Sequence, residues 1–230
     1  NTDIKGGVAI TYRDNNKDFG AIGTFTAFNE LNSIYQKVYT SKDFMTFSAL
    51  VVAPESYKLT DKLHQDYPNA ELQLSKGHKY DVTTNIFEKL PQIFKIELSA
   101  DELETDFIKI IGRENNLRSE KWVCKDYING PENLYGYKVI LPKSNGSGAI
   151  GEVLSTPLIG EPLIGHTQTF ISVGNFSTYE EAVACLKYIK TKFARTLLGI
   201  LKVTQHNPKA TWTFVPNQNF KSDSDIDWSQ

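Results

Sequence analysis

The sequence predicts an α+β fold, and three observations support this class. Strand-like apolar runs recur along the 230 residues without the regular strand–helix alternation of a parallel βαβ sheet. One strong amphipathic pattern, which begins after Ser177, predicts a single long helix near the C-terminus. Two runs at residues 4–12 and 21–28, separated by a polar turn, predict a β-hairpin near the N-terminus.

The other elements are expected in order between the hairpin and the long helix, with one strand after it. Leu31, Ile34, Tyr35 and Val38 lie at helical spacing and predict a helix directly after the hairpin. A short buried strand is expected at residues 47–52, and a short helix after Thr60. Further strands are expected at residues 93–98, 107–111, 122–128, 137–141, 169–173 and 211–215.

The long helix is expected to have one apolar face and one basic face. Ser177 and Glu180 form a capping-box pattern, and Phe176 stands in the staple position. The apolar face comprises Ala182, Leu186, Ile189, Phe193, Leu197 and Ile200. The basic face comprises Lys187, Lys190, Lys192, Arg195 and Lys202. This face suits a row of DNA phosphates, but it is equally typical of a solvated helix surface.

Composition indicates a folded protein without a membrane segment. Hydrophobic residues make up 40% of the chain and aromatic residues 12%. No apolar run approaches the length of about 18 residues that a membrane span needs. Cys124 and Cys185 lack metal-ligand spacing, and no signal-peptide pattern is present, so a cytoplasmic protein is expected. Both ends of the sequence look like cut points, as expected for a piece of a longer protein.

A glycine-rich loop follows the strand expected at 137–141. Residues 146–151 match the GxGxxG dinucleotide fingerprint by letter, but Pro157 and Pro162 exclude the helix that must follow it. The loop contains Lys143, Asn145 and neighbouring serines, which suit phosphates and base edges. An ordinary surface turn would have the same composition.

Several segments in this order resemble the C-terminal half of bacterial restriction–modification DNA methyltransferases that methylate adenine at N6. Residues 4–12 (IKGGVAITY) are similar to the hairpin strand that closes the methylase sheet of that family. Segments that resemble its target recognition domain are 107–112 (FIKIIG), 137–143 (YKVILPK), 174–176 (GNF), 188–193 (YIKTKF), 204–205 (TQ) and 215–216 (VP).

The resemblance implies a division of labour within a longer parent enzyme. Residues 1–90 would be the tail of the methylase domain and a connector, and residues 91–230 would be the DNA target recognition domain. A methylase core elsewhere in the parent chain would bind S-adenosylmethionine and hold the flipped adenine. The family's catalytic Pro-Pro motif is missing, and residues 19–23 only approximate its methyl-donor motif. This chain is therefore expected to bind double-stranded DNA without transferring methyl groups alone.

The residues expected to contact DNA come from the loop, the basic helix face and the segment after the helix. They are Lys143, Ser144, Asn145, Ser147, Lys187, Lys190, Lys192, Arg195 and Gln205. No catalytic, cofactor-binding or metal-ligating residue is expected; the sequence DIK at residues 3–5 lacks the second acidic residue of a nuclease site. Two other functions stay open: an enzyme that binds a phosphorylated small molecule through the loop, and a structural module that docks on a methylase subunit. The net charge of −2 argues against nucleic-acid binding, which usually requires a basic balance.

Overall fold

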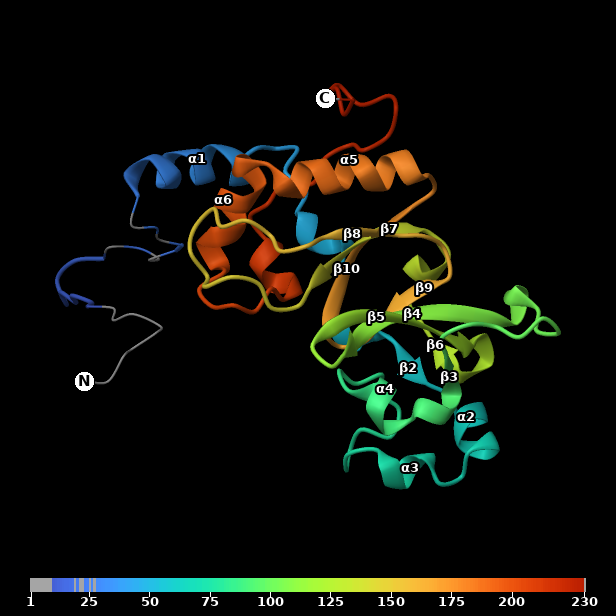
Figure 1. Cartoon of the computed structure of the whole chain (residues 1–230). Helices are drawn as coiled ribbons and strands as arrows, with labels where there is room; N and C mark the ends of the chain where they lie inside the picture. The colour runs from blue at the N-terminus through green and yellow to red at the C-terminus, as the bar shows by residue number, and fades with distance from the viewer. Residues whose placement is uncertain (1–9, 19, 21–22, 25, 27, 230) are drawn as a thin grey trace.

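The computed structural model describes residues 10–18, 20, 23, 24, 26 and 28–229, and it has the expected mixed α+β architecture (Figure 1). The first expected hairpin strand, at 4–12, lies mostly outside the described residues, as does much of the second. The described residues of both ranges contain no strand.

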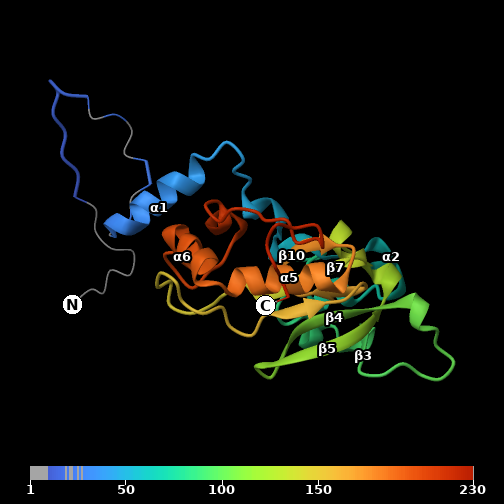
Figure 2. The ribbon, with the colours of Figure 1, turned by 90° about the horizontal axis from the view of Figure 1, so that it is seen from above.

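The first sheet is antiparallel and lies beneath a helix. Its strand order is β1 (Val51–Val52), β10 (Phe170–Phe176), β7 (Tyr137–Pro142) and β8 (Leu158–Gly160). Val173 of β10 is paired with Val51 on one side and Val139 on the other. Helix α5 (Tyr179–Lys190) packs across β7, β8 and β10, as Figures 1 and 2 show from the front and from above.

The second sheet is built on a long β-hairpin. Its order is β3 (Phe94–Lys95), β5 (Leu117–Cys124), β4 (Phe107–Glu114) and β9 (Ile164–His166), with β9 parallel to β4. Asn115 and Asn116 form the two-residue turn between β4 and β5, with φ angles of 49° and 62°. Asparagine tolerates these left-handed angles, and they match the twist of a tight hairpin.

A small ladder and several short helices complete the chain. β2 (Lys58–Leu59) pairs with β6 (Ile128–Asn129). The other α-helices are α1 (Asn29–Tyr39), α2 (Asp61–Asp66), α3 (Ala70–Gln73), α4 (Ile86–Lys89) and α6 (Lys192–Leu201). The 3-10 helices are η1 (Phe47–Leu50), η2 (Pro54–Ser56), η3 (Pro91–Ile93), η4 (Glu104–Asp106), η5 (Lys125–Tyr127), η6 (Glu132–Tyr135) and η7 (Lys209–Trp212).

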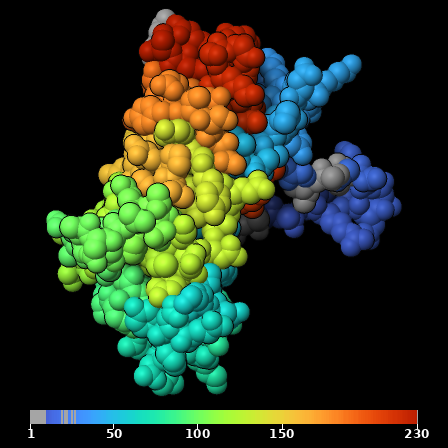
Figure 3. Space-filling model, turned by 90° about the vertical axis from the view of Figure 1, so that its right-hand side faces the viewer, coloured from blue at the N-terminus to red at the C-terminus, as the bar shows by residue number. Residues whose placement is uncertain are grey.

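The described residues form two main hydrophobic cores joined by a smaller one. The first core lies between α1, α5, α6 and the first sheet, and Trp212 is fully buried within it. The second core lies beneath the β4–β5 hairpin and includes Phe87 of α4. Ile111, Ile140 and Phe170 form the small core between them. The molecule is accordingly elongated, with the C-terminal segment and α5 toward one end and residues 61–89 at the other (Figure 3).

The expectation of one long helix near the C-terminus is wrong, because the chain breaks at Thr191. Thr191 has extended backbone angles (φ −63°, ψ 151°) and separates α5 from α6. Its hydroxyl accepts a hydrogen bond from the backbone N–H of Ala194 at 3.1 Å and donates to Tyr188 O at 2.8 Å. After the break, Phe193 is 42% exposed rather than part of the apolar face.

Thr191→Ala is expected to lower the free energy of unfolding by about 1 kcal/mol, the usual cost of losing an N-cap side chain. Urea unfolding of the two proteins measures this difference. Thr191→Ser keeps the hydroxyl and serves as the control, so equal losses in the alanine and serine variants would contradict the capping role.

Several smaller expectations are confirmed and others are wrong. The helix after the N-terminal region, the short helix after Thr60 and the strands near 107–111, 137–141 and 169–173 are confirmed. Residues 211–215 contain the end of η7 instead of a strand, and most of residues 47–52 form the 3-10 helix η1. The strand expected at 93–98 is shortened to β3. The strand expected at 122–128 is divided between β5 and β6. The N-cap of α5 is Thr178, one residue later than expected, and Glu181 accepts a hydrogen bond at 3.0 Å from the backbone N–H of Ser177, the residue before the N-cap.

Candidate nucleic-acid interface

Asn145, expected to pair with a base, is 4% exposed and serves to fold the glycine-rich loop. Its Nδ2 donates to Val153 O at 3.0 Å, and its Oδ1 accepts from the backbone N–H of Ser155. Its backbone N–H donates to Gln205 O at 2.8 Å. Because both ends of the carboxamide are engaged inside the protein, the assignment of Asn145 as a base-contacting residue is wrong for this structure.

Backbone N–H groups of the glycine-rich loop bind a carboxylate of the same chain. Glu152 accepts from Ser147 N–H at 2.8 Å and from Gly148 N–H at 3.1 Å. It also pairs with Lys202, which is 2% exposed and therefore does not belong to a basic helix surface. Burial raises the pKa of Glu152, but the hydrogen bonds from Lys202, Ser147 and Gly148 outweigh burial and leave this pKa below its ordinary value.

The expected basic helix face is largely engaged in contacts within the chain. Lys187 donates to Trp228 O at 2.6 Å and to Ser229 O at 3.1 Å. Arg195 donates from Nη1 to Gly151 O at 2.6 Å and from Nε to Lys190 O at 3.1 Å. Of the five expected cations, all of which lie in the described part of the chain, only Lys190 and Lys192 are exposed. The helices therefore do not present the continuous basic stripe that the sequence predicted.

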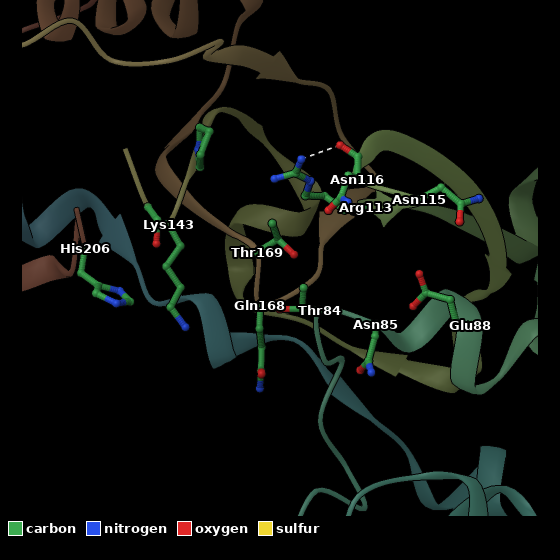
Figure 4. A pocket seen from close by; sticks show the side chains of 12 residues that line it. Thr84, Asn85, Glu88, Arg113, Asn115, Asn116, Lys143, Gln168, Thr169 and His206 are labelled. Atoms are coloured by element: carbon green, nitrogen blue, oxygen red, sulfur yellow. Dashed lines mark hydrogen bonds between the residues drawn. The ribbon is translucent and has the colours of Figure 1, made fainter. Parts of the chain in front are cut away.

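A polar cleft lies instead where the two main cores meet, with a volume of about 470 Å³ (Figure 4). We call it the polar cleft and define it by its lining residues. These are Thr84, Asn85, Glu88, Arg113, Asn115, Asn116, Pro142, Lys143, Ser144, Gln168, Thr169 and His206. They combine guanidinium, ammonium, amide, hydroxyl and carboxylate groups, which are the groups that contact phosphates and base edges.

Backbone hydrogen bonds bring the segments of the polar cleft together. Lys143 N–H donates to Thr169 O at 2.8 Å, and Lys143 O accepts from Asn207 N–H at 2.8 Å. Gln168 N–H donates to Val82 O at 3.0 Å, which connects the first sheet to the segment before α4. The Lys143 ammonium lies 3.7 Å from a carboxylate oxygen of Glu55.

Two arginines of the β4–β5 hairpin line a second hollow of about 490 Å³, and Arg113 belongs to both hollows. Arg113 Nη2 donates to Asn116 O within the hairpin turn. Arg118 Nη2 donates to Thr156 O at 2.7 Å, and its guanidinium lies 5.5 Å from the Phe170 ring centroid. Both guanidinium groups are thus held at the end of the hairpin beside the polar cleft.

Sequence reasoning found only part of this surface. Lys143 and Ser144 lie in the polar cleft, whereas Ser147 and Gln205 do not line it. The residues that it missed are Thr84, Asn85, Glu88, Arg113, Asn115, Asn116, Arg118 and Thr169. The Asn-Asn dipeptide between two strand-like runs was a usable signal, because such turns make hairpin tips.

The described part of the chain contains no group of three or more His, Cys, Asp or Glu residues placed to hold a metal ion. No helix among the described residues has the length and apolar character needed to cross a membrane.

Comparison with protein-family models, with curated proteins and with solved structures gave no match for this chain.

Proposed function

We propose that this chain is the DNA-recognition part of a type II restriction–modification adenine-specific DNA methyltransferase of the bacterial cytoplasm. Residues 1–90 would include the tail of the methylase domain, and residues 91–230 the target recognition domain. The chain would bind duplex DNA and present the target adenine to a methylase core that binds S-adenosylmethionine. Thr84, Asn85 and Glu88 precede residue 91 yet line the polar cleft, so the DNA-binding surface would extend into the connector.

The observation that supports this proposal best is the set of side chains at the tip of the β4–β5 hairpin. The major groove of B-DNA is about 12 Å wide and admits a two-stranded ribbon. Arginine can pair bidentately with guanine, and asparagine or glutamine with adenine. Arg113, Asn116 and Gln168 line one cleft beside such a ribbon.

Contacts with the phosphate backbone would come from a few separate cations. Lys143 lies on its wall and Arg118 in the adjoining hollow. Lys190 and Lys192 are exposed at the junction of α5 and α6. Because the net charge is −2, we expect affinity to depend on a few phosphate contacts and to be modest without the methylase core.

A bind-and-sequence selection on random duplexes, at low and then moderate salt, tests the proposal. An enriched sequence motif that survives added salt is the expected result. Retention without a motif would reduce the chain to a general phosphate-binding surface. No retention at low salt would contradict the proposal and favour the docking module, because Glu152 already occupies the loop that a phosphorylated small molecule would need.

Lys143→Ala is expected to weaken binding to all sequences alike and to reduce the slope of log K against log salt by about one unit. Binding isotherms at several salt concentrations measure this slope. Lys76→Ala is the control, because Lys76 is an exposed cation that does not line the polar cleft. An unchanged slope for Lys143→Ala would remove Lys143 from the interface.

A further inference from the structure

Two opposite charges line the polar cleft without pairing with each other. Arg113 comes from the end of β4, and its guanidinium donates to Asn116 O. Glu88 comes from α4, and Figure 4 shows its carboxylate extending from the helix toward the hairpin. Among the described residues, the Glu88 carboxylate takes part in none of the hydrogen bonds or ion pairs. The Arg113 guanidinium, a hydrogen-bond donor, and the Glu88 carboxylate, an acceptor, therefore both line the polar cleft.

Close packing between α4 and β4 fixes this arrangement. Ile86 and Phe87 of α4 are buried in the second core. Phe87 packs directly on Gly112, where an added Cβ would lie 2.6 Å from Phe87 Cε2. Gly112 and Phe87 immediately precede Arg113 and Glu88 in sequence, so their contact holds together the two backbone segments from which Arg113 and Glu88 extend. Functional side chains gain precision from support of this kind.

The two groups complement one base pair in the major groove. Guanine presents two adjacent acceptors, N7 and O6, which match the arginine fork. Cytosine presents its N4 amino group, a donor that a carboxylate accepts. An A·T pair offers a donor, adenine N6, and an acceptor, thymine O4, but it lacks two adjacent acceptors on one base, so only C·G satisfies both arms of the arginine fork as well as the carboxylate. An arginine fork beside a carboxylate therefore favours C·G.

We propose that Arg113 and Glu88 together read one C·G base pair of the target, Arg113 on the guanine and Glu88 on the cytosine. This inference rests on the proposed function. It adds to that function the identity of one base pair that residues of the polar cleft recognise. Glu88 is the specificity-determining residue that the sequence did not indicate.

The test is a bind-and-sequence selection with the wild type, Glu88→Gln and Arg113→Lys at one salt concentration. Both side chains are exposed, so the variants are expected to fold. The wild-type motif should contain a fixed C·G pair. Each variant should relax that same position, with a loss of preference of about 10-fold. Glu97→Gln removes an exposed carboxylate outside the polar cleft and should leave the motif unchanged.

The outcomes separate this inference from the proposed function. If the wild type retains no DNA, or retains it without a motif, the proposed function fails and the C·G assignment fails with it. If the wild type selects a motif but Glu88→Gln leaves it unchanged, only the assignment is overturned. The C·G assignment is also overturned if Glu88→Gln and Arg113→Lys relax different positions of the motif. Two residues that read one base pair must affect the same position.

Discussion

Glu152→Ala is expected to lower the free energy of unfolding by about 3–5 kcal/mol, the usual cost of leaving a buried charge without its partner. Lys202 is 2% exposed, and Glu152 is its only carboxylate partner among the described residues. The Lys202 ammonium also donates to Asn145 O at 2.7 Å and Thr204 O at 3.1 Å, but carbonyls do not neutralise it. Urea unfolding of the wild type and the variant measures the loss.

A double-mutant cycle isolates the interaction between the two residues. Lys202→Met removes the buried charge while keeping similar bulk, and Glu152→Ala in that background no longer leaves an unpaired ammonium. The double variant should therefore lose less stability than the sum of the two single variants. Additive losses, or a loss below about 1 kcal/mol for Glu152→Ala, would show that the pair is not the main constraint on the loop.

The same pair gives stability a defined dependence at acid pH. Because the pKa of Glu152 is lowered in the folded protein, its contribution is present above the ordinary glutamate pKa of about 4.3 and is lost as pH falls through the lower folded value. The difference in stability between the wild type and Glu152→Ala should therefore shrink at acid pH.

Local patterns predicted those elements whose signals are contained in a short segment. Leu31 and Tyr35, one helical turn apart, are both buried on the inner face of α1. Thr60 caps α2, as its position before a helical segment indicates. The break between α5 and α6 escaped prediction, because Thr191 is compatible both with a helix interior and with an N-cap. The packing of α6 against η7 and the loop at Gly151 favours the second arrangement.

The candidate site was harder to predict, because it depends on contacts between distant segments. The loop at 143–148 contains the residue types of a DNA contact, and Lys143 does line the polar cleft. The same residue types also stabilise loops by hydrogen bonds within the protein. The buried carboxamide of Asn145 has this structural role, because it donates to a backbone carbonyl of the loop. The shared role that we propose for Glu88 and Arg113 depends on the contact of Phe87 with Gly112, two residues far apart in the sequence, so no local pattern indicates it.

Lys138 is expected to make stability rise with pH above neutrality. Its side chain is 0% exposed, and burial lowers its pKa to about 7. Between that value and the ordinary lysine pKa of about 10.4, the unfolded chain binds a proton that the folded protein does not bind. The contribution of Lys138 to stability must therefore rise with pH across this window, by about 1.4 kcal/mol per pH unit at most.

The matched comparison is Lys138→Met, with unfolding by urea measured from pH 6 to pH 10. Burial also raises the pKa of Tyr57, Tyr188 and Cys185, which lowers stability at high pH in both proteins. The difference between the two proteins removes these shared contributions. It should grow in favour of the wild type from about pH 7 upward, by a total on the order of 4 kcal/mol.

A second measurement covers the case in which Lys138→Met does not fold. Lys138 donates to Leu134 O at 3.3 Å, Gly136 O at 3.0 Å and Glu161 O at 2.9 Å, and methionine would leave these three carbonyls without that donor. Nuclear magnetic resonance titration of carbon-13-labelled lysine in the wild type reports the pKa directly. Burial lowers the pKa of His166 to about 4, so the neighbouring imidazole stays neutral throughout the titration. A Lys138 pKa near the ordinary lysine value would contradict the prediction. It would mean that the three carbonyls keep the ammonium charged despite burial, and the rise in stability with pH would then be absent.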